Sequence, residues 1–283
     1  DLLASPWSER LETELSERHP LKKAKELFAL YKNAFSRQYQ EQTSVTRTVN
    51  DISILENLDK NNNIDCDIYR EAIDAETEIA RIRLFSRERI LLSNILPILD
   101  NLGLIAIEQF PANVEVPGRK EYFIATFRVR PATTPPINLL SRRNRLRAAI
   151  QALLLGAMTN DPLNKLLLAA DIPWTYVVLI RAYERYARQL GLPYNRQTYE
   201  NALLAHPNTV RSMTELFRSQ FDPDFEGLSP EGVDKARETA ITNATRHISE
   251  LLGGVTDLTT DQILQVFFQM IRATLRTNFY QRD

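Results

Sequence analysis

Four arginines stand within six residues, at Arg142, Arg143, Arg145 and Arg147, and open a predicted helix. A guanidinium can bind a carboxylate or a phosphate through two parallel N–H groups, so this cluster could pair with acidic groups or hold a phosphate-bearing ligand. On a helix the four side chains spread around most of the circumference. A solvated helix face is the plainer interpretation, and ion pairing with an adjacent domain is favoured over ligand binding.

The single thiol is a poor nucleophile candidate. Cys66 begins a predicted strand between Asp65 and Asp67, whose negative charges favour the protonated thiol. The three histidines have acidic or hydroxyl neighbours, but solvated or locally capped side chains are the favoured interpretation. These are His19, His206 and His247. One cysteine and three scattered histidines cannot form a closed zinc site. We therefore predict no catalytic residue and no metal ligand.

A phosphate-binding loop is also missing from the sequence. A dinucleotide fold needs a glycine-rich turn between a strand and a helix, where backbone amides meet the pyrophosphate. The chain has eight glycines, and only Gly253 and Gly254 are adjacent. They lie between helical segments, and no G-x-G-x-x-G spacing occurs. No cofactor is expected to bind this chain.

The composition limits the class of protein. With 35 Lys and Arg against 36 Asp and Glu, no global field attracts nucleic acid or an anionic membrane. No run reaches the roughly 20 apolar residues that span a bilayer, and residues 1–20 do not resemble a signal peptide. One cysteine excludes an internal disulfide, so we expect a cytoplasmic protein. The start at Asp1 and the charged end after a helical pattern suggest a piece of a longer chain.

Aromatic and basic residues interleave between positions 174 and 188, a pattern that could indicate a single-stranded nucleic-acid platform. Helical spacing favours packing instead, with Val178, Ala182 and Tyr186 on one side and Leu179 and Tyr183 adjoining. We interpret most of these aromatics as core. A nucleic-acid binder is a weaker hypothesis, because its binding would depend strongly on salt and the net charge here is −1.

The apolar spacing predicts α+β structure followed by an all-helical region. Residues 1–42 and 44–58 have helical periodicity, whereas 65–73, 78–85, 104–116 and 121–130 alternate as strands do. Between the strand pairs we expect a helix that Ser93 caps, with Pro97 near its first turn and Gly103 at its C-terminus. The order of helix, strand, strand, helix, strand, strand predicts a small α/β sandwich with a circularly permuted ferredoxin-like order.

We divide the chain at the proline-rich segment that follows Arg130. The expected parts are an N-terminal helical segment (1–43), a small α/β domain (44–131), a linker (132–138) and an all-helical domain (139–283). The helical domain is expected to break at 160–162, 191–193, 206–207, 222–230 and 253–254. Its last helix is predicted to begin with a capping box of Thr259 and Gln262 and to carry a continuous apolar face from Leu264 through Leu275 to Phe279.

Four segments carry a resemblance to a known family. They are ILPILDNLGL (95–104), DPLNKLLLAA (161–170), the helix from Trp174 to Tyr186 with LIRAYERY, and IRATLRTNFYQ (271–281). In this order they resemble the non-catalytic region that precedes the catalytic domain of large bacterial NAD-specific glutamate dehydrogenases. Residues around Trp174 and at Gln262 and Gln265 depart from the pattern, and the first sixty residues match it loosely.

The resemblance implies a function for the intact protein. Members of that family deaminate L-glutamate oxidatively to 2-oxoglutarate and ammonia and reduce NAD. It implies an ACT-type regulatory module, a helical part that links it to the catalytic domain, and a homo-oligomer. The family's catalytic lysine and aspartate and its NAD-binding loop would lie beyond Asp283, with Arg276 and Asn278 as further candidates for contact with that domain. The alternative is a stand-alone docking or amino-acid-sensing module without activity.

An ACT-like domain suggests an amino-acid effector. The candidate loop contains Arg87 and Arg89 and leads into the helix at Ser93, where backbone amides could meet a carboxylate. We keep this loop as the predicted effector site.

Overall fold

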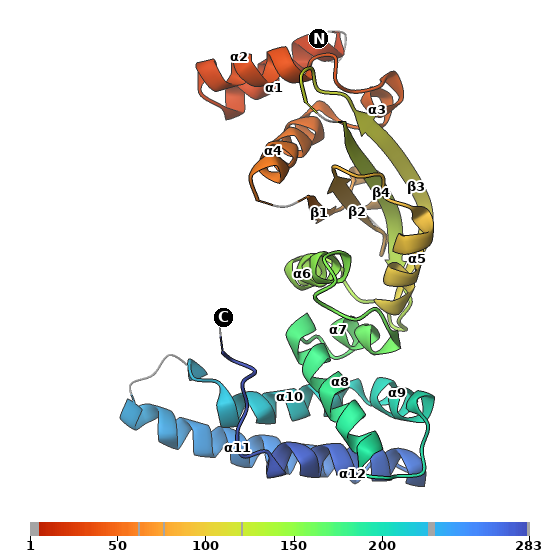
Figure 1. The fold of residues 1–283 in the computed structure, drawn as a ribbon, viewed down its shortest axis with the longest axis vertical. Coiled ribbons are helices and arrows are strands. Elements are labelled where there is room, and N and C mark those ends of the chain that lie inside the picture. The colour runs from red at the N-terminus through yellow and green to blue at the C-terminus, as the bar shows by residue number, and fades with distance from the viewer. Residues whose placement is uncertain (1–5, 62, 76, 120, 226–229, 282–283) are drawn as a thin grey trace. The chain divides into compact units, whose positions relative to one another are not determined.

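The computed structural model describes residues 6–61, 63–75, 77–119, 121–225 and 230–281, and it divides into two compact units. The first unit comprises the described residues of 1–100, 104–143 and 150–155, and the second comprises those of 101–103, 144–149 and 156–283. Figure 1 shows the elements of each unit. We describe each unit by itself.

Among the residues described before the sheet of the first unit, the chain forms four helices: α1 (Trp7–Arg18), α2 (Leu21–Tyr31), α3 (Arg37–Gln42) and α4 (Val45–Asn61). The prediction of one helix over 1–42 was wrong, because His19 and Pro20 are extended, with ψ of 151° and 142°. A residue before proline avoids the helical region, and proline has no N–H for the preceding turn. The prediction of a helix in the following segment is confirmed by α4.

A four-stranded antiparallel sheet forms the centre of the first unit. Its strands are β1 (Ile64–Tyr69), β2 (Ala80–Ser86), β3 (Leu104–Val114) and β4 (Tyr122–Pro131), in the order β1-β2-β4-β3. This is the order that a circularly permuted ferredoxin-like sandwich gives, so the predicted fold class is confirmed. The first predicted strand was too long, because the chain turns into a 3₁₀ helix at Ala72–Asp74.

Helix α5 (Leu92–Asn101) connects β2 to β3 and corrects two predictions. It begins at Leu92, so Ser93 lies in its first turn and is not the cap, and Pro97 lies inside the helix. The prediction for Gly103 is confirmed: its φ of 76° is left-handed, which suits glycine because other residues have a Cβ that crowds the backbone there.

The sheet face toward the N-terminal helices has an apolar part and a polar part. Phe85 and Ile124 join buried side chains of α1, α2 and α4 in one core, and Figure 1 shows α4 beside β1 and β2. Farther along the same face, Arg83 of β2 lies opposite Thr126 of β4, and Arg81 lies opposite Arg128. Because side chains alternate along a strand, all of these residues point to the same side.

Helices α6 to α12 follow the sheet and confirm the predicted helical region with its breaks. They are α6 (Arg143–Leu154), α7 (Leu166–Ala169), α8 (Trp174–Gln189), α9 (Arg196–Ala205), α10 (Pro207–Phe221), α11 (Pro230–Leu252) and α12 (Leu258–Ala273), with 3₁₀ turns at Leu140–Arg142 and Pro162–Lys165. Residues 226–229, in one expected break, lie outside the described residues.

The predicted cap and face of the last helix need correction. Asp257 caps α12 by accepting from the backbone N–H of Thr260, so the Thr259–Gln262 box is not used. The apolar face includes Leu264 but ends with the helix at Ala273, and Leu275 is 89% exposed.

The predicted packing side of α8 was also wrong. Tyr186 and Val178 are exposed, whereas Val177, Ile180 and the charged Arg181 are buried. Arg181 is buried because it finds ionic partners, which apolar periodicity does not reveal.

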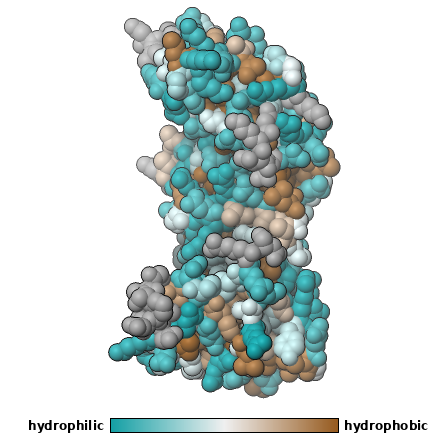
Figure 2. All heavy atoms as spheres, turned by 60° about the vertical axis from the view of Figure 1, so that its left-hand side comes forward, coloured by the Kyte–Doolittle hydropathy of each residue, from teal (hydrophilic) through white to brown (hydrophobic). Residues whose placement is uncertain are grey.

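The molecular surface that Figure 2 shows is mostly hydrophilic, with hydrophobic residues in scattered groups. Among the described residues, no helix combines the length and the apolar character that crossing a bilayer requires.

Candidate functional site

A buried ionic network crosses from α4 to the sheet and is centred on Asp51. The Asp51 carboxylate is fully buried and accepts hydrogen bonds from Tyr39 Oη at 2.6 Å, Arg47 Nε at 3.0 Å and Arg83 Nη1. Arg47 also pairs with Asp67 of β1 at 2.7 Å. Because an unpaired buried charge is costly, these partners hold α3, α4 and β2 in one arrangement.

Burial sets the protonation behaviour of this network. Complete burial raises the pKa of the Asp51 carboxyl above its ordinary value, although Arg83 and Arg47 oppose that effect. Burial and the neighbouring Asp51 raise the pKa of the Tyr39 hydroxyl well above its usual range. Tyr39 therefore remains a hydrogen-bond donor and cannot serve as a base near neutral pH.

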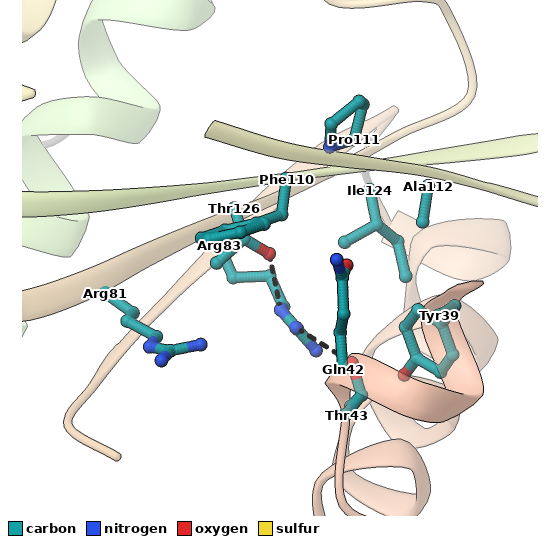
Figure 3. A pocket seen from close by; sticks show the side chains of 10 residues that line it. All are labelled: Tyr39, Gln42, Thr43, Arg81, Arg83, Phe110, Pro111, Ala112, Ile124 and Thr126. Carbon is teal, nitrogen blue, oxygen red and sulfur yellow. Dashed lines mark hydrogen bonds between the residues drawn. The ribbon is translucent and has the colours of Figure 1, made fainter. Parts of the chain in front are cut away.

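A cavity of about 170 Å³ lies between the end of α3 and the polar part of the sheet face. Figure 3 shows its lining side chains, with Gln42 reaching from α3 toward the sheet between Phe110 and Ile124. The lining residues are Tyr39, Gln42, Thr43, Arg81, Arg83, Phe110, Pro111, Ala112, Ile124 and Thr126. No carboxylate side chain is among them, so the ionised groups of the wall are both cationic.

The two arginines of the wall are held differently. Arg83 is nearly buried and donates from Nε to Thr126 Oγ1 at 2.8 Å and, at a long 3.4 Å, from Nη2 to Thr43 Oγ1. Arg81 donates from Nε to Asp74 at 3.3 Å and lies with its guanidinium carbon 6.0 Å from the centre of the Phe110 ring. Two guanidiniums beside hydroxyls and hydrocarbon can bind an anion, but they supply no nucleophile and base pair.

The second unit contains its own buried ionic network. Arg181 of α8 donates to Asp161 from Nε at 2.7 Å and from Nη2 at 2.9 Å, and from Nη2 to Asn164 Oδ1 at 2.7 Å. Arg196 of α9 adds a bond to Asp161 at 2.9 Å. Asp161, Asn164 and Arg181 belong to two of the segments on which the family resemblance rests. The segments that resemble the family therefore include a buried ion pair and a hydrogen bond that connect α8 to the 3₁₀ turn at Pro162–Lys165.

The effector site predicted from the sequence consists of residues that do not line the cavity, namely Arg87, Arg89 and Ser93. Arg87 is half-buried, and Arg89 and Ser93 are exposed. None of the three lines the cavity, and Arg89 lines a separate shallow depression beside Ser36 and Asn113. Arg81 and Arg83 were not among the predicted site residues, although two arginines at alternate positions of a mostly apolar strand are a signal that could have indicated them.

Three arginines of the cluster lie on α6, and Arg142 ends the 3₁₀ turn before it. Arg145 bonds the backbone carbonyl and the carboxylate of Asp171 in the second unit. Arg143 and Arg147 are exposed, and Arg142 is half-buried. Arg145 therefore has an internal partner, while the contacts proposed for the cluster with a further domain stay a prediction.

In the part of the chain that the structure describes, no three histidine, cysteine, aspartate or glutamate residues form a group that could hold a metal ion. Cys66 is a buried free thiol in β1. His206 lies between α9 and α10, and His247 lies 3.8 Å from Glu250 on α11.

The permuted four-stranded sandwich with appended helices defines a multidomain chain that contains an ACT-like domain. Family models match three successive segments: glutamate dehydrogenase helical motif 2 at residues 14–58, the glutamate dehydrogenase ACT3 domain at 63–141, and glutamate dehydrogenase helical motif 3 at 158–223. Most of helix α4 lies in the first of these segments, and the whole sheet lies in the second. The chain belongs to the glutamate dehydrogenase family that these models describe.

Three curated relatives that the chain matches are named NAD-specific glutamate dehydrogenase. The protein of Halomonas elongata is 31% identical over 99% of this chain, that of Mycobacterium tuberculosis is 30% identical over 88%, and that of Pseudomonas aeruginosa is 30% identical over 92%. The matches cover 17%, 15% and 16% of the relatives, respectively. The chain thus spans about a sixth of their length.

Proposed function

We propose that the protein containing this chain oxidatively deaminates L-glutamate to 2-oxoglutarate and ammonia with reduction of NAD, and that this chain is its regulatory and scaffolding segment. The names of the relatives support the activity of the whole protein. In this proposal, the residues that bind NAD and perform the reaction lie in the catalytic domain beyond Asp283.

The ionisable side chains that line the cavity are the observation that supports a non-catalytic role for this chain. The cavity's ionised groups are two arginines, and its tyrosine is fixed as a donor by Asp51. Proton transfer in glutamate oxidation needs a group that titrates near the working pH, which neither a guanidinium nor Tyr39 provides. The cavity is therefore suited to binding, and a binding site in an ACT-like domain supports regulation.

The C-terminal segment supports the scaffolding role. Phe279 packs against the rings of Phe217 and Tyr176, with ring centres 5.4 Å and 5.2 Å apart, and the Tyr280 and Tyr176 hydroxyls share a hydrogen bond of 2.8 Å. Aromatic pairs of this kind each contribute about 0.5–1.5 kcal/mol beyond the burial of their area, so they hold this segment against α8 and α10. Arg276 and Asn278 are exposed on the same segment, where they can contact a following domain.

The test is a coenzyme and product assay on the full-length protein. We expect glutamate to reduce NAD, with 2-oxoglutarate and ammonia formed in equal amounts and much slower reduction of NADP. Absence of glutamate-dependent NAD reduction in the folded protein would overturn the proposed activity. The proposal also places the protein in the cytoplasm as a homo-oligomer, which fractionation and light scattering would check.

A further inference from the structure

The cavity beside α3 combines a cationic side with a hydrocarbon side. Arg81 and Arg83 form the first, and the side chains of Phe110, Ala112 and Ile124 contribute the second. A polar cavity alone would attract only water or an inorganic ion, whereas an apolar wall favours a ligand with its own hydrocarbon part.

The acids that balance the two arginines lie outside the cavity wall. Asp51 accepts from Arg83, and Asp74 accepts from Arg81 and, at 2.6 Å, from Arg128. An anion in the cavity would therefore approach the guanidiniums without meeting a carboxylate of the wall. Among the described residues, Arg81 forms its hydrogen bond through Nε, so its two terminal nitrogens remain able to donate.

Arg83 provides a fixed positive charge in this arrangement. Thr126 and Asp51 hold two of its nitrogens, and its contact with Thr43 at 3.4 Å is longer than a normal hydrogen bond. A ligand oxygen could replace that weak contact without disturbing the other two. Arg81 and Arg83 can thus offer two positive charges to the same ligand, and that of Arg83 is fixed in place before the ligand binds.

The size of the cavity limits the ligand. A cavity of about 150 Å³ in another protein holds benzene, so 170 Å³ suits a molecule of comparable size. We propose that this cavity binds a small monocarboxylate with a branched hydrocarbon tail, its carboxylate on Arg81 and Arg83 and its tail on Phe110 and Ile124. The inference deepens the proposed regulatory role, but its test is direct binding, so it can fail while the dehydrogenase activity stands.

The test is calorimetric titration of the full-length protein with isovalerate, with isovaleramide and inorganic phosphate as matched probes. We expect one isovalerate site per chain, binding of the neutral amide at least about tenfold weaker because it lacks the charge, and no phosphate binding at this site. Absence of isovalerate binding, or equal binding of acid and amide, would overturn the proposal. Phosphate binding with equal affinity would show an adventitious anion site and would also overturn it.

Variants locate the site. Arg81→Gln should weaken isovalerate binding at least about tenfold. The variant should still fold, because the buried Asp74 keeps its ion pair with Arg128. Ala112→Leu should abolish binding by filling the cavity. The matched control is Arg246→Gln, which removes an exposed arginine paired with Glu250 in the second unit and should bind as the wild type does. Unchanged affinity in folded Arg81→Gln would place the ligand elsewhere and contradict the proposal.

Discussion

Arg83 and Asp51, which are 32 residues apart in the sequence, form a buried ion pair that joins the second strand of the sheet to helix α4. Neither partner is exposed to solvent by more than a few per cent, and Tyr39 and Arg47 complete the bonds of the carboxylate. The pair fixes one side of the cavity and the position of α3 above it. The stability of the sandwich and the shape of the proposed binding site therefore depend on the same contact.

The substitution Asp51→Asn should destabilise the protein strongly. Removing the carboxylate takes the acidic partner from the buried Arg83 and leaves the buried Arg47 paired with Asp67. Breaking a buried pair in this way costs about 3–5 kcal/mol. Urea denaturation measures the loss. Glu41→Gln, which removes an exposed pair with Arg37, is the control and should cost less than about 1 kcal/mol. Equal effects of the two substitutions would show that the network is not structural.

Glu56 should make the protein sensitive to acid. Burial opposes its charge, but hydrogen bonds from Arg119 at 2.6 Å and Tyr31 at 2.9 Å outweigh burial and lower its pKa below the ordinary 4.5. The folded state then binds this proton less tightly than the unfolded state. The stabilisation is present above the ordinary pKa and is lost as pH falls through the lower, folded value.

The measurement for Glu56 is the free energy of unfolding between pH 6 and about 3. The wild type should lose more stability over this window than Glu56→Gln, which has no carboxyl to protonate. Parallel curves for the two proteins would contradict the assigned direction of the pKa shift.

Two glycine substitutions should differ because of backbone geometry. Gly103 has a φ of 76°, so Gly103→Ala should cost about 1–2 kcal/mol even though the nearest side-chain atom, on Lys165, leaves room for a methyl group at 3.7 Å. Gly253 has no positive φ and its nearest neighbouring atom is at 3.5 Å, so Gly253→Ala should be nearly neutral. Thermal unfolding compares them, and a larger loss for Gly253→Ala would refute this explanation.

Phe279 should hold the C-terminal segment on α8 and α10. Phe279→Ala removes ring contacts with Phe217 and Tyr176, and we expect a local loss of about 1–2 kcal/mol, seen as roughly tenfold faster amide exchange near the end of the chain. Leu275→Ala changes a side chain that is 89% exposed and should leave exchange unchanged. If exchange is equally fast in both variants, the aromatic contacts do not fix this segment.

The strands and most helices could be predicted from local patterns. Alternation of apolar residues and turn signals such as Gly103 depend on a few neighbouring residues, and the structure confirms them. Helix ends were less accurate: α12 begins one residue after the cap Asp257, whereas Thr259 offered an equally plausible local signal.

The cavity could not be predicted in the same way. Arg83 meets Asp51 and Thr126 across 32 and 43 residues, so no local spacing indicates that they touch. The effector loop at Arg87 was proposed because of its position before a helix, a signal that depends on neighbouring residues alone. Buried charges such as Arg181 also escape an analysis based on apolar periodicity, because burial of a charge depends on partners distant in sequence.

We expect this chain to contribute no group to the chemistry of glutamate oxidation. The most direct test is the kcat of the full-length protein after replacing every histidine and the single thiol of the chain, as His19→Gln, His206→Gln, His247→Gln and Cys66→Ala. Removal of a general acid or base lowers the rate by about 10²–10⁴-fold. We predict glutamate-dependent NAD reduction within about threefold of the wild-type kcat, well short of such a loss. A loss of a hundredfold or more in the folded variant would place a catalytic group in this chain and contradict the account.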